Sequence, residues 1–168
     1  MSITRLSTIN MSKCAVIAVA CLFGVRDASA GGSENIETIL TKAFFIQNIT
    51  IYCSQFTPKI IENSSGKYGD ISRLAYHIRQ EVVSELPADQ SIFVVRRSAD
   101  MARAGALQAV RQFYELDRDR ERARIVEWCE QSATLEIAEY VEAHDEKHDA
   151  FVATIIEAKK RYNITNPK

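Results

Sequence analysis

The sequence has few of the residues that interrupt helices. Only three prolines and six glycines occur in 168 residues, and neither type occurs between Gly105 and Pro167. Proline removes a helical hydrogen bond and glycine weakens a helix, so their scarcity favours long helical segments. Apolar runs long enough to cross a membrane are also lacking after residue 31. We therefore expect helices without a membrane span in that part of the chain.

An excess of charge and recognisable catalytic motifs are lacking too. The chain has 21 basic and 22 acidic residues and a formal net charge of −1, so no electrostatic attraction to nucleic acid or anionic lipid is expected. No serine lies in a Gly-x-Ser-x-Gly elbow. Gly66 and Gly69 flank Lys67-Tyr68 without the spacing of a phosphate-binding loop. We predict no catalytic residue, no cofactor and no enzymatic activity.

The first thirty residues have the pattern of a cleaved export signal. Arg5 and Lys13 precede an apolar run too short for a membrane anchor, and Ala28-Ser29-Ala30 is an A-x-A cleavage site. We expect a signal peptide at residues 1–30 and one exported domain at residues 31–168, in the bacterial periplasm or secreted. The alternative is a lipoprotein anchored at Cys21, because Ala-Val-Ala-Cys loosely resembles a lipobox.

The four cysteines become two, Cys53 and Cys129, once this signal is removed. An exported chain with two cysteines usually joins them. We predict a Cys53–Cys129 disulfide, which would stabilise the fold by roughly 4 kcal/mol through chain entropy alone. Trp128 is expected to cover the bond. The alternative is a pair of buried free thiols.

The strongest helical pattern runs from Ile92 to Val141. Apolar and small residues recur there at steps of three and four, which places them on one seam of a helix. The first half of the seam comprises Ile92, Val95, Ala99, Ala102, Ala106, Ala109, Phe113 and Leu116, and the second half comprises Val126, Cys129, Ala133, Ile137, Tyr140 and Val141. We expect the rest of the chain to pack against this stretch, with the alanines allowing a close helix–helix approach.

The remaining segments and the size of the domain predict the fold class. Ser33 and Asp70 are candidate caps for two earlier helices, and Pro87 ends the second of them. An unbroken helix from Ile92 to Tyr162 would exceed about 100 Å at roughly 1.5 Å per residue, far longer than a compact domain. We predict an all-α, single-domain bundle of four to five helices linked by one disulfide. The connections are expected near residues 63–69, 87–89, 117–121 and 143–148.

His144 and His148 are the one pair that suggests metal chemistry. Four residues apart, they share a helix face, as a pair of metal ligands must. The segment HDEKH differs from the zinc-protease HExxH pattern, because Asp145 replaces the glutamate and no third ligand follows. The alternatives are a metal site using both histidines, with Glu142 or Asp145 if the helix bends, or a solvated turn with both rings exposed. His77 is expected to be a half-buried packing residue.

These observations favour a binding protein over an enzyme. We expect an exported helical protein that acts on an unidentified protein partner as a chaperone, inhibitor or immunity-type protein. The surfaces singled out for this role are the loop Asn63–Gly69 and the charged edge Asp117–Arg124. The alternative is a metal-binding protein that uses His144 and His148.

Overall fold

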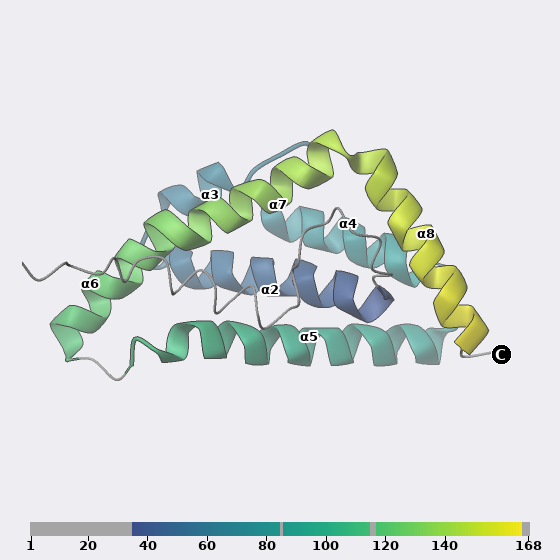
Figure 1. Ribbon diagram of the computed structural model, residues 1–168, viewed down its shortest axis with the longest axis horizontal. Coiled ribbons are helices and arrows are strands. Elements are labelled where there is room, and N and C mark those ends of the chain that lie inside the picture. The colour runs from purple at the N-terminus through teal and green to yellow at the C-terminus, as the bar shows by residue number, and fades with distance from the viewer. Residues whose placement is uncertain (1–34, 85, 115–116, 166–168) are drawn as a thin grey trace, which may run out of the picture. The chain divides into compact units, whose positions relative to one another are not determined.

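The computed structural model describes residues 35–84, 86–114 and 117–165, and this part of the chain is an all-α domain (Figure 1). Its elements in chain order are α2 (Ile36–Ser54), α3 (Lys59–Asn63), α4 (Ile71–Val83), α5 (Ala88–Arg111), α6 (Arg118–Trp128), a π-helix (Cys129–Ala133), α7 (Thr134–Glu146) and α8 (His148–Thr165). The predicted fold class is confirmed. The signal peptide, the lipid-attachment alternative at Cys21, the Ser33 cap and Leu116 lie outside the described residues.

The helix at the centre of the bundle is α2, and the expectation that the chain packs around residues 92–141 is wrong. Helix α2 packs most extensively against α5 and then against α4, and it also touches α3, α7, α8 and the π-helix (Figure 1). Its only charged residues are Glu37 and Lys42. A helix with so few charges can be surrounded on most sides. Its buried residues are Ile36, Ile39, Leu40, Thr41, Ala43, Phe45, Ile46, Ile49, Thr50 and Cys53.

Helix α5 lies along α2 with a buried face shifted from the predicted seam. Ile92, where the seam was expected to begin, is 68% exposed, whereas Val94 is fully buried. Ala102 and Ala109 are buried as expected, and the small Ser98 lies close enough to donate a hydrogen bond of 3.2 Å to the Glu37 carbonyl of α2. Small residues therefore do allow the close approach, but the face is set by contact with α2.

Aspartate and asparagine caps begin three of the helices. The side chains of Asn35, Asp70 and Asp117 accept hydrogen bonds from the backbone N–H three residues ahead, at 2.7, 2.9 and 3.2 Å. These bonds satisfy N–H groups that have no partner within the helix. Asp70 is the cap that the sequence predicts for α4.

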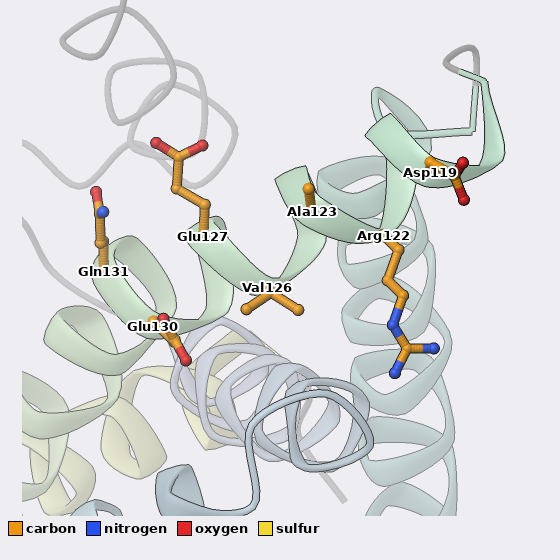
Figure 2. Close-up of a pocket in the computed structure, with 7 residues that line it drawn as sticks. All are labelled: Asp119, Arg122, Ala123, Val126, Glu127, Glu130 and Gln131. Carbon is orange, nitrogen blue, oxygen red and sulfur yellow. The ribbon is translucent and has the colours of Figure 1, made fainter.

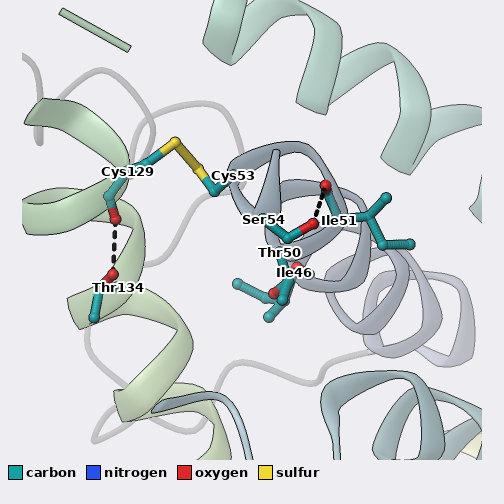
Figure 3. The surroundings of a disulfide bond; sticks show 7 residues. All are labelled: Ile46, Thr50, Ile51, Cys53, Ser54, Cys129 and Thr134. Atoms are coloured by element: carbon teal, nitrogen blue, oxygen red, sulfur yellow. Dashed lines mark hydrogen bonds between the residues drawn. A yellow bond between two sulfur atoms is a disulfide. The ribbon is translucent and has the colours of Figure 1, made fainter. Parts of the chain in front are cut away.

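The predicted disulfide is present and joins the end of α2 to the π-helix (Figure 3). Cys53 and Cys129 are both fully buried, and 76 positions separate them. Trp128 packs its ring against Phe113, with 5.7 Å between the ring centroids. None of the helices in the described part of the chain has the length and apolarity that crossing a bilayer requires.

The π-helix interrupts what is otherwise one long helical segment from Arg118 to Glu146. A π-helix closes its hydrogen bonds over five residues, and the interruption is often found at functional sites. The Thr134 hydroxyl donates a hydrogen bond of 2.7 Å to the Cys129 carbonyl, five residues earlier (Figure 3). The disulfide is thus attached at the least regular turn of this segment.

Candidate functional site

The loop between α3 and α4 is a tight turn that reaches the far end of α7. Gly66 and Gly69 each donate their N–H to the carbonyl of the other, at 2.9 Å. Gly69 has a φ of 87°, a left-handed conformation that glycine adopts without strain. The turn places Lys67 and Tyr68 at its tip. The predicted loop is therefore present, and it is an ordered turn.

Two hydrogen bonds join this loop to the corner between α7 and α8. The Lys67 N–H donates to Asp145 Oδ2 at 2.8 Å, and the Tyr68 hydroxyl lies 2.5 Å from His148 Nδ1. Lys147, with φ −113° and ψ 30°, leaves helical geometry and separates α7 from α8. The break falls inside the predicted range of 143–148. Asp145 and His148, on either side of the break, hold the loop in place.

All three histidines of the chain line one small pocket at this corner. The cavity measures about 50 Å³ and is formed by the loop, α4, α7 and α8. Most of its wall is apolar, and the polar groups are imidazoles, a phenol and one carboxylate. The lining residues are Tyr68, Leu74, His77, Ile78, Glu81, His144, His148, Phe151 and Val152.

The His144 ring is fixed in one orientation, and only one of its two nitrogens forms a hydrogen bond among the described residues. Its side chain is buried, and its ring lies 4.3 Å from Tyr140 and 4.1 Å from Phe151, measured between centroids. Nδ1 lies 2.6 Å from the Tyr140 carbonyl oxygen, which can only accept, so Nδ1 carries the proton. Burial lowers the pKa of the imidazole, against the opposing effect of this hydrogen bond. Nε2 is buried and has no hydrogen-bond partner among the described residues.

Tyr68 links the other two histidines. Its ring centroid lies 5.1 Å from that of His77 and 5.5 Å from that of His148. His77 is exposed, so the expectation that it is half-buried is wrong, because the neighbouring elements leave this side of α4 uncovered. His148 is half-buried. Sequence reasoning missed this grouping, because nothing in the spacing of His77, Glu81 and Tyr68 shows that the loop folds onto α8.

The structure tests the predicted turn at His144 and His148, whereas the metal site stays a prediction. The turn exists, but the expectation that both rings are solvated is wrong, since the corner folds inward against Phe151. Glu142 is exposed and does not line the pocket, and Asp145 is engaged by the loop. Within residues 35–84, 86–114 and 117–165, no group of three His, Cys, Asp or Glu side chains is arranged to hold a metal ion.

A shallow hollow lies along α6 and the π-helix, over part of the charged edge singled out from the sequence (Figure 2). Figure 2 shows its side chains spread along one helical surface, with acidic and basic groups mixed. The lining residues are Asp119, Arg122, Ala123, Val126, Glu127, Glu130 and Gln131. No polar groups converge here, so this hollow is a weaker candidate than the histidine pocket.

The outward side of α5 is the other unusual surface. Large apolar side chains lie exposed along this helix and the turn that follows it: Ile92 (68%), Phe93 (56%), Met101 (48%), Leu107 (60%) and Tyr114 (55%). Single exposed apolar residues are common, but several large ones along one helix can form part of a binding surface. Of these five residues, only Ile92 was part of the predicted buried seam, and the sequence made no prediction for the other four.

No family model, no curated protein and no solved structure matches this chain. The described part of the chain is an all-helical domain with one disulfide, a histidine-lined pocket and several exposed apolar residues along α5. Function has to be inferred from the pocket and these exposed residues.

Proposed function

We propose that this protein is an exported, non-enzymatic binding protein that engages a protein partner through the outward face of α5. The face is defined by six exposed residues at alternating steps of four and three: Phe93, Arg97, Asp100, Ala104, Leu107 and Arg111. This spacing forms a straight stripe along a helix. The single observation that supports the proposal is this second, exposed stripe opposite the buried one.

The residue types on the stripe match those that dominate protein interfaces. Phenylalanine, tyrosine, methionine and arginine are enriched at interface centres, and tyrosine and arginine often contribute most of the binding energy. Here Phe93 lies near one end of the stripe, Arg111 at the other, and Leu107 between them. A partner helix with apolar residues at matching spacing would cover Phe93 and Leu107 in one contact.

The charge of α5 indicates the chemistry of the partner. The helix exposes four arginines, Arg96, Arg97, Arg103 and Arg111, against only two acidic residues, Asp89 and Asp100. Arg97 already lies 3.4 Å from Glu37 in an ion pair, and the other three extend the basic border. We infer a partner segment that is amphipathic and acidic. Complementary charge of this kind raises association rates and rejects basic competitors.

Export is supported by the buried disulfide, which persists in oxidising compartments. The same reasoning favours the periplasm or the extracellular space over the cytosol. A chaperone, an inhibitor or an immunity-type protein would each use a helical surface of this kind.

Site-specific photo-crosslinking in the cells that make the protein tests this proposal. A photoreactive phenylalanine analogue replaces Leu107 in one variant and Leu135, 61% exposed on α7, in a matched control. We expect one discrete adduct from position 107 and none from position 135. The adduct should disappear when Arg111→Glu is added to the Leu107 variant.

Three results would reject the proposal. These are equal labelling at the two positions, no adduct at position 107, and an adduct with twice the mass of the chain, which would identify a second copy as the occupant. Circular dichroism of each variant confirms that it keeps its helical content.

A further inference from the structure

We propose that the histidine pocket binds one transition-metal ion, with His144 Nε2 and His148 as its two protein ligands. This function is separate from partner binding on α5, and neither requires the other. The class of ion is that which neutral imidazole prefers, namely Cu²⁺, Ni²⁺ or Zn²⁺.

His144 has the arrangement of a preoriented metal ligand. A ligating histidine nearly always donates its second ring N–H to a carboxylate, a backbone carbonyl or water, which fixes the tautomer and the ring. His144 makes such a bond to the Tyr140 carbonyl at 2.6 Å. Its Nε2 therefore keeps a lone pair, is buried and has no partner among the described residues. A buried acceptor without a partner is unusual in a folded protein.

His148 supplies the second imidazole from the first residue of α8. It lines the same small cavity as His144, so both rings border one space. The Tyr68 hydroxyl lies 2.5 Å from Nδ1 and 3.1 Å from Nε2 of His148. Tyr68 therefore competes with a metal ion for this ring. It belongs to a partly exposed loop that can withdraw more easily than a helix.

The rest of the coordination sphere is water. No three His, Cys, Asp or Glu side chains within the described ranges are arranged to hold an ion, so a third protein ligand is not part of the proposal. A cavity of about 50 Å³ exceeds the roughly 10–15 Å³ that one water requires, and Tyr68 and Glu81 at its lining supply polar partners for a metal-bound water. The carboxylate of Glu81 at the lining offsets part of the charge. With so few protein ligands, we expect Cu²⁺ to bind most tightly, as in the general order of divalent metals.

Isothermal titration calorimetry of the untagged, disulfide-bonded chain with Cu²⁺ and with Zn²⁺ tests the site. We expect one Cu²⁺ per chain with a Kd below about 10 μM, and weaker Zn²⁺ binding. His148→Ala and His144→Phe should each weaken Cu²⁺ binding at least about tenfold, the latter while keeping an aromatic ring between Tyr140 and Phe151. Tyr68→Phe should tighten binding, because it removes the competing hydroxyl.

His77→Ala is the matched control, because it removes the one histidine of the pocket that the proposal does not use. We expect its Kd to stay within about threefold of wild type. Binding weaker than about 10 μM, or a loss in His77→Ala equal to that in His148→Ala, would overturn the proposal. Circular dichroism shows whether each variant is folded. If His144→Phe fails to fold, the comparison of His148→Ala with His77→Ala decides the question.

Discussion

Helix α7 and the π-helix before it are fastened to the rest of the molecule at both ends, by different means. At one end Cys129 is bonded covalently to Cys53 of α2, and both residues are fully buried. At the other end Asp145 and His148 receive the loop through hydrogen bonds that are partly open to water. The first connection cannot open without reduction. The second opens whenever its hydrogen bonds exchange with water.

This difference assigns different tasks to the two ends. The disulfide end is closed by a covalent bond between two fully buried residues, which fixes the end of α2 against the π-helix. The histidine end keeps an unsatisfied nitrogen, a cavity and a loop held by a few bonds of about 0.5–1.5 kcal/mol each. Stability is therefore expected to concentrate at the first end and adaptability at the second, as is usual for binding regions.

Removal of the disulfide should have the largest effect. The double variant Cys53→Ser with Cys129→Ser is expected to lose about 4 kcal/mol of unfolding free energy, because the unfolded chain regains the freedom of a long loop. Urea unfolding followed by circular dichroism measures this loss. Wild-type protein treated with a reductant should lose a similar amount. A change below about 1 kcal/mol would show that packing, and not the covalent bond, holds this end.

A substitution at the loop should have an intermediate effect, confined to the histidine end. A Cβ atom on Gly66 would overlap Asp145 Oδ2 and Val141 Cγ1, so Gly66→Ala pushes the loop away from α7. We expect a loss of about 1–3 kcal/mol, typical of overpacking. Urea unfolding measures it, and faster proteolysis at the loop should accompany it.

Ser65→Ala serves as the control for this substitution. The neighbouring side chain is exposed, so its removal should change stability by no more than about 0.5 kcal/mol. Equal effects from the two variants would mean that the loop is not packed as described.

The smallest effect is expected from Glu136, on α7 between the two connections. Burial raises the pKa of its carboxyl group, although Lys42 lowers it in part. A raised folded-state pKa means that the folded protein holds the proton more tightly than the unfolded chain. This contribution to stability is complete below the usual pKa of glutamate and is lost as pH rises through the folded-state value. Glu136→Gln, which stays neutral, should therefore raise the melting temperature at pH 7 and lose this advantage near pH 4.

Thermal unfolding of Glu136→Gln at the two pH values measures this effect. Glu139→Gln, with an exposed side chain on the same helix, is the control and should show no comparable gain. A gain at pH 4 as large as that at pH 7 would contradict the assigned cause.

The disulfide end was largely predictable from the sequence, and the histidine end was not. With residues 1–30 set aside as an expected signal peptide, two cysteines remain and leave one pairing, and both are fully buried in the structure. Hydrophobic spacing shows which face of a helix is buried, but not which neighbour covers it. That limit explains why α2 was not recognised as the central helix and why Ile92 was expected to be buried.

The histidine pocket depends on contacts between residues about 80 positions apart, such as Tyr68 with His148. Nothing in the local sequence encodes such a contact. The sequence did predict the turn near Lys147, because the apolar stripe lapses there. It did not predict that His144, which lies in the last turn of α7, is buried.

The π-helix has a consequence for how this chain can change length during evolution. Its wider turn accommodates one residue more than an α-helix needs, and Glu130 and Gln131 within it are exposed. Loss of one of these residues would return the turn to α-helical geometry, with Cys129 and His144 still facing inward. Loss of one residue within α2 would rotate the part of that helix after the deletion by about 100°. The apolar side chains of that part would then no longer face their neighbours. Homologous chains one residue shorter or longer should therefore differ here, at the turn beside the disulfide, before they differ in the central helix.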